Sequence, residues 1–429
     1  MIFLSYNVSQ NIELNNHKEL TIAFYKIYLI MRKTFFKTLW ALLAIVAMVP
    51  FVACSDNDEP GVKSYEVTVN LTLPEGVDAA SVQDLKLVTT KGTVSDTISL
   101  NATTAEKITL AQGQYTFSVS GKIKDDATAH VVGTGTADVY ANQAVTLALQ
   151  TVYQSPLVFK AIFTTGGIAG YVKDSYFEIV NNSDEVQYLD GLILSAPTGN
   201  QTKANAWQAA GITDRYECGQ GTVVAFPGVS GGKEYPLQPG ESVVVANDAA
   251  NHNELANAGN NCPDLSNAEW EIQITNSGDP SYIDHTLSVI FQNNQYMKAF
   301  GLGFFGRAYI LAKLPEGTTP EAYAADPNNL MTTPGSTSTM QYLMIPSKYV
   351  LDAVDIWNSS NENNYATFLP KDDAQGVLAS TAWAGKCVRR KVTKIVNGRA
   401  YYQDTNNSAN DFLNNQPLTP GVKPTEVDK

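Results

Sequence analysis

Histidine is scarce in this chain, with four residues among 429, and no two of them lie within four positions of each other. Helical zinc sites need such spacing, so the sequence predicts none. Cysteine is equally scarce, with four residues and no C-x-x-C pair, which argues against a zinc ribbon or a thioredoxin-type motif. The formal net charge of −13 disfavours unspecific binding to nucleic acid. We expect no metal, no cofactor and no nucleic-acid partner.

Residues 31–53 have the pattern of a bacterial lipoprotein signal peptide that ends directly before Cys54. Basic residues open the segment, an apolar run occupies 39–52, and Ala53 supplies the small residue before the cysteine. The apolar run is short for a hydrocarbon core of about 30 Å, so a transmembrane anchor is the weaker alternative. We predict that Cys54 carries lipid and attaches the mature protein to a membrane.

The segments on either side of this signal refine the prediction. Residues 1–30 hold polar and charged side chains that are unusual before a signal peptide, so translation is expected to begin at Met31. Residues 54–62 form an acidic tether that resembles the surface-export signal of Bacteroidota lipoproteins. This resemblance implies a position on the outer membrane, facing outwards. An ordinary solvated tether is the alternative interpretation.

The mature chain is predicted to be mostly β and to begin with a sandwich of immunoglobulin or transthyretin type at 63–150. Residues 67–73 alternate apolar and polar side chains, which is the two-residue period of a half-buried strand. The alternation returns at 115–119 and 145–149, with turn residues between these segments. Several short strands separated by turns are typical of a β-sandwich.

A second β domain is predicted at 157–420, followed by a flexible tail at 421–429 that is rich in charged residues. The domain opens with the apolar run 157–163, and Asn397-Gly398 is a strong signal for a two-residue hairpin turn. A long Asn-rich stretch at about 250–382 is interpreted as a large irregular insertion into this domain.

Parts of the second domain resemble known families. Segments 178–194, 237–246 and 403–421 resemble lamin-tail domains, which are small immunoglobulin-like sandwiches, with the insertion separating the two halves. Over nearly its full length, the mature chain resembles a family of Bacteroidota lipoproteins that carry a domain of unknown function, number 4876. Segments such as 264–270 and 385–391 carry that resemblance. The family implies a fold and an envelope location, but no catalytic residues.

Two short motifs match catalytic or cofactor patterns without the required context. Residues 228–232 fit G-x-S-x-G, but no helix pattern follows the serine, as a nucleophile elbow requires. Residues 301–306 fit G-x-G-x-x-G, but a strand-like run follows where a dinucleotide site needs a helix. These glycines are better explained by close packing of the backbone.

An envelope hydrolase with its site in the 250–382 insertion remains an alternative. It would need carboxylates that converge in one pocket, and the candidates are Glu254, Asp264, Glu269 and Asp284.

A weak calcium candidate and one possible disulfide complete the polar features. Asp404, Asn406 and Asp411 lie in an oxygen-rich loop, but the Gly and Glu that an EF-hand loop requires are missing. Capping of backbone groups is the alternative. Among the three cysteines that are not lipidated, Cys218 and Cys262 are the favoured pair because both lie in Gly/Asn-rich sequence, although sequence alone does not determine the pairing.

A basic cluster near the end of the chain is a candidate surface for an anionic partner. Protection of a sheet edge by charge is the alternative that we favour. The cluster consists of Lys386, Arg389, Arg390, Lys391, Lys394 and Arg399. Tryptophans in the second domain could form a carbohydrate-stacking surface but are more often core residues. They are Trp207, Trp270, Trp357 and Trp383.

These observations predict a lipid-anchored cell-envelope protein that binds a partner and is not an enzyme. The partner would be an outer-membrane barrel such as a TonB-dependent transporter, or a glycan. A structural adhesin or spacer is a further alternative, because nothing in the sequence identifies a ligand.

Overall fold

The computed structural model describes residues 63–428, except 93, 101–104, 125, 220, 256–258, 260 and 275–280 and the side chains of 126–128. The predicted start at Met31, the signal peptide, the lipidated Cys54 and most of the acidic tether lie outside the described residues. Strands account for 46% and helices for 8% of the structure, so the predicted mostly β class is confirmed.

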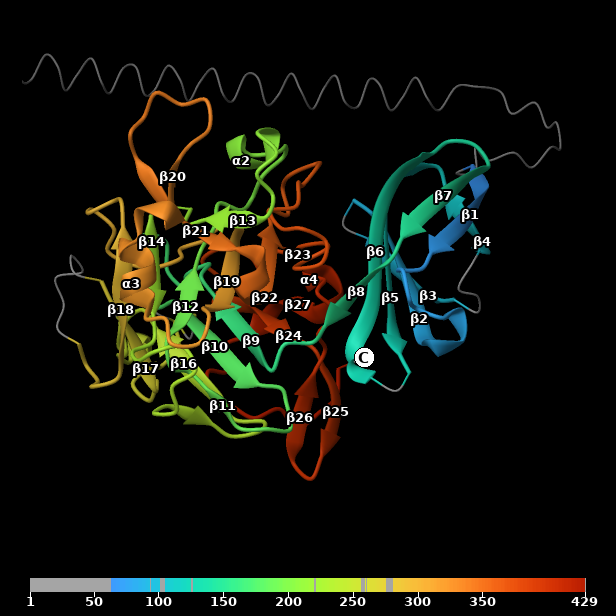
Figure 1. Ribbon diagram of the computed structural model, residues 1–429. Helices are drawn as coiled ribbons and strands as arrows, with labels where there is room; N and C mark the ends of the chain where they lie inside the picture. Colours follow the sequence, from blue (N-terminus) through green and yellow to red (C-terminus); the bar gives the residue numbers. More distant parts are fainter. Residues whose placement is uncertain are drawn as a thin grey trace, which may run out of the picture. The chain divides into compact units, whose positions relative to one another are not determined.

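The first eight strands form a β-sandwich of two sheets, with strand orders β4-β1-β7 and β3-β2-β5-β6-β8 (Figure 1). The alternating apolar side chains predicted from the sequence face inward, including Val67, Val69, Phe117 and Leu147. The last strand ends three residues beyond the predicted boundary, because residues 150–153 pair with β6. The strands are β1 (Ser64–Thr72), β2 (Val82–Lys91), β3 (Val94–Ser99), β4 (Ala105–Ala111), β5 (Gly113–Ile123), β6 (Asp126–Val139), β7 (Gln143–Ala148) and β8 (Gln150–Tyr153).

The second domain is organised around a mixed sheet that has twelve strands among the described residues. The order is β23-β22-β19-β12-β14-β18-β17-β16-β10-β9-β24-β27. In that order, the strands are Val377–Leu378, Val350–Trp357, Arg307–Lys313, Leu192–Ser195, Thr222–Ala225, Thr286–Gln292, Trp270–Gln273, Ser242–Ala246, Tyr176–Asn181, Leu157–Phe163, Lys386–Arg390 and Phe412–Pro417.

This main sheet folds over on itself, so that β22 lies against β9 and β23 lies against β27. All twelve strands contribute side chains to one enclosed core, among them Phe159, Phe177, Tyr309, Val354 and Phe412. Continuous burial along β9 and β10 follows, because their inner faces meet the core and their outer faces are covered by other segments. An apolar run in the sequence is therefore explained by burial on both faces of the sheet.

Smaller elements cover the outer faces of the main sheet. Ile193, Val223 and Ile310 point outward and pack against a layer that includes Tyr216 and Leu343. This layer consists of β13 (Arg215–Glu217), β21 (Gln341–Pro346), β20 (Leu330–Thr332) and α3 (Pro320–Ala325).

The remaining described elements are short. Asn397 and Gly398 both have positive φ, as the predicted two-residue hairpin turn requires. That hairpin, β25 (Val392–Val396) with β26 (Arg399–Tyr402), projects from the domain in Figure 1. The others are β11 (Gln187–Tyr188), β15 (Pro236–Leu237), α2 (Ala206–Ala209), α4 (Ser408–Asp411), and the 3-10 helices η1 (Ala79–Ser81), η2 (His252–Glu254), η3 (Pro327–Asn329) and η4 (Ser347–Tyr349).

The segment 250–382, expected to be an irregular insertion, supplies β17, β18, β19, β22 and β23 to the main sheet. The strands in this segment are short and separated by long Asn-rich loops. For this reason, the sequence pattern does not show that they pair within the main sheet. The tail predicted to be flexible is also attached to the domain. The Lys160 ammonium donates to the Val422 carbonyl oxygen at 2.8 Å, and Asp428 pairs with Arg389 at 2.7 Å.

Two buried carboxyl groups attach the crossover 358–376 to the sheet. Asp355 on β22 accepts the Thr367 backbone N–H at 2.7 Å. Asp373 accepts the backbone N–H of Asp355 at 2.7 Å and the Ser408 N–H and hydroxyl at 2.8 and 2.7 Å. Burial raises the pKa of Asp355 to about 6. Burial, together with the charge of Asp355, also raises the pKa of Asp373.

We expect the free energy of unfolding to fall as the pH rises from about 4 to about 6. Below that window, both states hold the Asp355 proton. Within it, the unfolded chain releases the proton near its ordinary pKa of 3.8, while the folded state retains it. Asp355→Asn should reduce this fall by on the order of 3 kcal/mol in urea unfolding measured across the window. Glu254→Gln, at an exposed carboxylate, is the control, and an unchanged profile in Asp355→Asn would contradict the assignment.

Candidate functional site

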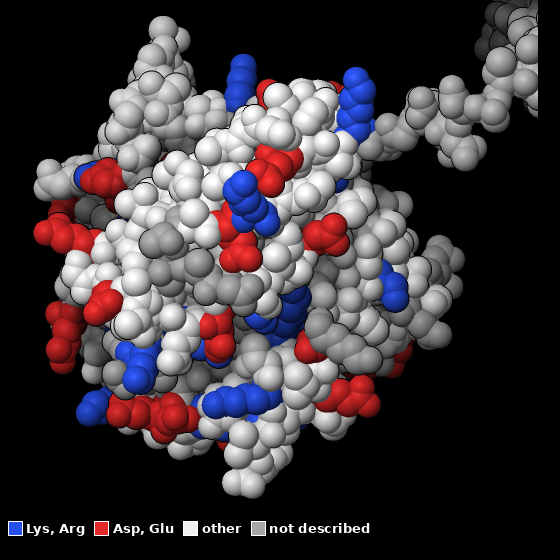
Figure 2. All heavy atoms as spheres, turned by 90° about the vertical axis from the view of Figure 1, so that its right-hand side faces the viewer, with Lys and Arg blue, Asp and Glu red and all other residues white. Residues whose placement is uncertain are grey.

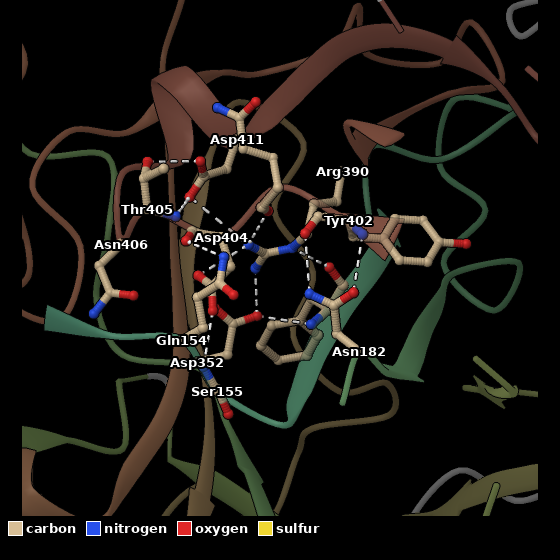
Figure 3. Close-up of polar contacts among 12 residues, drawn as sticks. Gln154, Ser155, Asn182, Asp352, Arg390, Tyr402, Asp404, Thr405, Asn406 and Asp411 are labelled. Carbon is tan, nitrogen blue, oxygen red and sulfur yellow. Dashed lines mark hydrogen bonds and ion pairs between the residues drawn. The ribbon is translucent and has the colours of Figure 1, made fainter. Parts of the chain in front are cut away.

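Arg390, at the end of β24, is buried among three aspartates in the second domain (Figure 3). Its guanidinium lies 2.5 Å from Asp352, 3.3 Å from Asp404 and 3.7 Å from Asp411. It also donates to the backbone carbonyl oxygens of Phe159 at 2.7 Å and of Gln403 at 3.0 Å. Asp352 in turn accepts the Phe159 N–H at 2.7 Å, so β9, β22 and β24 meet at this ion cluster.

The charges in this cluster depend on one another. Burial disfavours the charge on Arg390, but the three aspartates outweigh burial and hold the pKa of the guanidinium above its ordinary value. Burial raises the pKa of Asp352 and of Asp404, and Arg390 opposes that rise. A lone ion at this depth would be strongly unfavourable, so the cluster is stable only as a unit.

The predicted basic surface is therefore not a single patch, because Arg390 is directed into the domain. Arg389 forms two hydrogen bonds with the Asp428 carboxylate, at 2.8 and 2.7 Å, and Arg399 pairs with Asp184 at 2.7 Å. Lys394 lies over the Tyr401 ring, and Lys386 and Lys391 are half-buried. On the face drawn in Figure 2, Lys and Arg are interspersed with Asp and Glu.

In the oxygen-rich loop considered as a calcium candidate, the two aspartates pair with the Arg390 guanidinium instead. Asp404 and Asp411 direct oxygens to Arg390, and Asp411 also accepts the Thr405 N–H and hydroxyl at 2.8 and 2.7 Å. Asn406 donates its amide to the Lys371 carbonyl oxygen. Within the described part of the chain, no group of three or more His, Cys, Asp or Glu is placed to hold a metal ion.

The favoured disulfide is absent, because Cys218, Cys262 and Cys387 are buried free thiols among the described residues. Cys218 packs in the outer hydrophobic layer beside Tyr216, whereas Cys262 lies against Gly167 and Asp174. Burial raises the pKa of all three thiols to about 12. Thiols with so little thiolate are poor nucleophiles.

The carboxylates considered for a hydrolase are exposed, and three of them accept hydrogen bonds from nearby groups. Asp264 accepts the Ser266 N–H and hydroxyl at 3.0 and 2.6 Å, and Glu269 accepts the Val244 N–H at 2.8 Å. Glu254 lies 3.3 Å from the Asn251 amide, and Asp284 is exposed.

The serine in the G-x-S-x-G motif has a structural position. Ser230 is buried and donates its hydroxyl to the Leu314 carbonyl oxygen at 2.5 Å. The surrounding motif therefore does not present this hydroxyl at the surface.

A different group of loops meets at one end of the main sheet, which we call the rim. Here β9, β12, β18, β22 and β23 finish and β10, β14, β19 and β24 begin. Five segments at this end form the rim: 164–171, 197–202, 300–306, 358–366 and 379–385. Connections at strand ends are where binding residues usually lie, because the sheet holds them rigidly.

The glycine-rich segment 300–306 is fastened to the end of the sheet. Asn247 accepts the Phe300 N–H at 2.7 Å and donates to the Phe300 carbonyl oxygen at 2.9 Å. The Tyr309 hydroxyl donates to the Gly301 carbonyl oxygen at 2.6 Å. A side chain at Gly306 would collide with backbone, since its Cβ would lie 2.4 Å from the Ile356 oxygen. The glycines therefore allow close packing, as predicted, and the loop presents two phenylalanines.

Trp383 meets this loop from the neighbouring rim segment. Its ring centroid lies 4.2 Å from that of Phe304, and its backbone N–H donates to the Thr165 carbonyl oxygen at 3.1 Å. Trp383 has a φ of 60°, in the left-handed region that a bulky residue rarely occupies. Phe305, beside this pair, is 58% exposed. The exposed aromatic beside a strained backbone makes this part of the rim the candidate site.

Sequence inspection missed Phe304 and Phe305 and considered Trp383 only as one of four tryptophans. Trp207 and Trp270 are core residues, with 6% and 4% exposed. The sequence signal for this surface is a pair of adjacent phenylalanines between glycines. Glycines let the loop backbone pack closely on the sheet, and the side chains between them are then directed outward.

Residues 238–419 match the model of a family described as a protein of unknown function (DUF4876). The crystal structure of a DUF4876 family protein from Bacteroides thetaiotaomicron VPI-5482 matches with 28% sequence identity and a TM-score of 0.53. The match covers 84% of this chain and 96% of that chain. The predicted resemblance to this family is confirmed over residues 238–419, which carry a DUF4876 domain.

A second solved structure, described as "a putative adhesin from Bacteroides ovatus ATCC 8483", matches with 8% identity and a TM-score of 0.18. It covers 78% of this chain and 99% of that chain, but at this TM-score it supports no conclusion about fold or function. No protein with a curated description matches this chain.

We expect Arg390→Met to lower the free energy of unfolding at pH 7 by about 3–5 kcal/mol, because three buried aspartates lose their counter-ion. The loss should be smaller at pH 5, where these carboxyls can take up protons. Arg215→Met is the control. Arg215 forms a surface pair with Asp214 at 2.8 Å, and its loss should cost less than about 1 kcal/mol. Equal losses for the two variants in urea unfolding would contradict a central role for Arg390.

Proposed function

We propose that this protein, which belongs to the DUF4876 family through its domain at 238–419, is a lipid-anchored cell-envelope protein that binds an extracellular ligand. Three features support the proposal. They are the signal pattern ending at Cys54, two β modules, and an aromatic rim on the second module. The observation that carries it is the exposed Phe305 beside the strained Trp383.

The proposed anchor is the lipid on Cys54, and the proposed location is the outer surface of the outer membrane. The acidic residues after Cys54 support outward export. Among the residues that the structure describes, no helix is long and apolar enough to cross a bilayer. An outer-membrane barrel such as a TonB-dependent transporter is the proposed neighbour, to which the rim would deliver its ligand.

We propose binding rather than catalysis for this protein. The candidate carboxylates Asp264 and Glu269 are held by neighbouring hydrogen-bond donors, and Ser230 is buried. The rim, by contrast, presents apolar surface, which favours holding a ligand over moving a proton.

We expect Cys54→Ala to abolish incorporation of an alkyne-labelled palmitate, because this residue supplies the thiol that accepts the lipid. The labelled fatty acid is detected by click chemistry after immunoprecipitation from cells. Ser55→Ala is the matched control and should retain the label. Label that persists in Cys54→Ala would contradict the anchor.

We also expect Phe305→Cys to react with a membrane-impermeant maleimide on intact cells. Phe305 is 58% exposed, whereas Cys218, Cys262 and Cys387 are buried with raised pKa values and give little background. The unsubstituted protein provides that background. Labelling that appears only after the cells are permeabilised would contradict an outward-facing rim.

A further inference from the structure

We propose that the rim binds a neutral oligosaccharide, with sugar rings stacked on its aromatics and hydroxyl groups bound by its amides. This inference rests on the proposed function and names the ligand class for the same surface. Three properties of the rim lead to it: exposed aromatic rings, a neighbouring group of side-chain amides, and very little charge.

The aromatic component consists of Phe304, Phe305, Trp383 and Tyr365. Phe305 and Tyr365 are 58% and 41% exposed, and Phe304 and Trp383 are half-buried. A pyranose ring has a face of C–H groups, and aromatic rings offer a flat apolar partner for such a face. A ligand that is polar at its edges and apolar on one face fits this surface better than a wholly apolar ligand does.

The segment that carries Tyr365 lies beside the aromatic loop. The Tyr365 N–H donates to the Gln201 carbonyl oxygen at 2.7 Å. The Arg307 guanidinium donates to the Ala196 carbonyl oxygen at 2.8 Å, and a Cβ on Gly306 would lie 3.2 Å from the Asn358 nitrogen. Segments 197–202, 300–306 and 358–366 therefore lie side by side.

Side-chain amides gather on this part of the rim. Asn361 donates to the side-chain oxygens of Asn200 at 3.2 Å and of Asn364 at 3.1 Å. Asn364 donates to the Asn358 carbonyl oxygen at 3.2 Å. An amide offers a donor and an acceptor side by side, which matches a pair of neighbouring sugar hydroxyls. These half-buried residues hold one another in place and retain free hydrogen-bonding capacity.

The low charge of the rim favours a neutral ligand. The five rim segments contain one charged residue, Glu362, and the exposed Lys203 and Lys298 lie just beyond their ends. An acidic glycan or a phosphorylated ligand would require arginine or lysine in these segments. A neutral oligosaccharide needs neither, so it is the ligand class that agrees with this composition.

The rim is also fixed before any ligand arrives. Thr165 donates its hydroxyl to the Lys386 carbonyl oxygen at 2.8 Å, and Asn415 accepts the Thr381 N–H at 2.7 Å. Together with the fastening of the 300–306 loop, these bonds restrain both aromatic segments. Because the loops are already ordered, ligand binding costs less conformational entropy, and weak stacking contacts are then sufficient for affinity.

The test uses the full chain, purified in detergent, on an array of the neutral hexasaccharides of glucose, mannose, xylose and galactose. Acidic galacturonate oligomers are included on the same array. The strongest interaction is then titrated by calorimetry. We expect at least one neutral hexasaccharide to bind, with little change in Kd between 0.05 and 0.5 M salt. Phe305→Ala and Trp383→Ala should each weaken binding about tenfold or more.

Tyr140→Ala is the matched control, because Tyr140 is 59% exposed but lies in the first domain. It should leave the Kd unchanged. Phe305→Ala removes an exposed side chain, so its thermal unfolding should match that of the unsubstituted protein and exclude misfolding as the cause.

Three results would overturn the inference: no binding of a neutral hexasaccharide, binding that Phe305→Ala leaves intact, or binding restricted to the acidic oligomers and lost in high salt. None of them would affect the palmitate and maleimide results. Failure of the ligand class is therefore distinguishable from failure of the anchored envelope location.

Discussion

The ion pair between Arg390 and Asp352 closes the main sheet of the second domain. Asp352 lies on β22, near one edge of the strand order, and Arg390 lies on β24, near the other. Asp352 also accepts the Phe159 N–H from β9, so a single carboxylate joins the two halves of the folded sheet. Without the Asp352 carboxylate, the Phe159 N–H and the Arg390 guanidinium would lose a hydrogen-bond acceptor between β22 and β9. The enclosed core depends on these two halves remaining together.

An ion pair in such a place is favourable only when its polar atoms are satisfied, because the loss of hydration costs several kcal/mol for each ion. Arg390 meets that condition through the backbone oxygens of Phe159 and Gln403 in addition to its three aspartates. These hydrogen bonds are directional, unlike apolar packing. They form in the register of β22 against β9 and β24 that places Asp352 opposite Arg390 and the Phe159 N–H. Removing one partner would leave an uncompensated buried charge, so the closure depends on the whole cluster.

The sequence allowed the strands, the hairpin turn at Asn397-Gly398 and the family to be predicted, because each depends on local pattern or on resemblance. It did not reveal the closure. Phe159 and Asp352 are separated by 193 positions, and nothing local marks them as partners. Arg390 stands among other basic residues, which predicts a place at the surface, and two of the aspartates that bind it, Asp404 and Asp411, match a weak calcium candidate or capping residues. Neither pattern identifies the ion cluster, since a charged residue's partner is set by tertiary structure.

Closure also bears on why the proposed ligand surface lies at the rim and not at the opposite end of the sheet. At the Arg390 end, the loop 403–411 is occupied with internal hydrogen bonds to Arg390 and to its own backbone. At the rim, the polar groups that fasten the loops are mostly backbone atoms, Asn247 and Tyr309, which leaves the side chains of Phe305 and Tyr365 facing solvent. Trp383 holds a left-handed backbone at a cost of about 1 kcal/mol or more. The indole packs on Phe304 and against Gly166, and this contact offsets the strain that glycine or asparagine would avoid at that position.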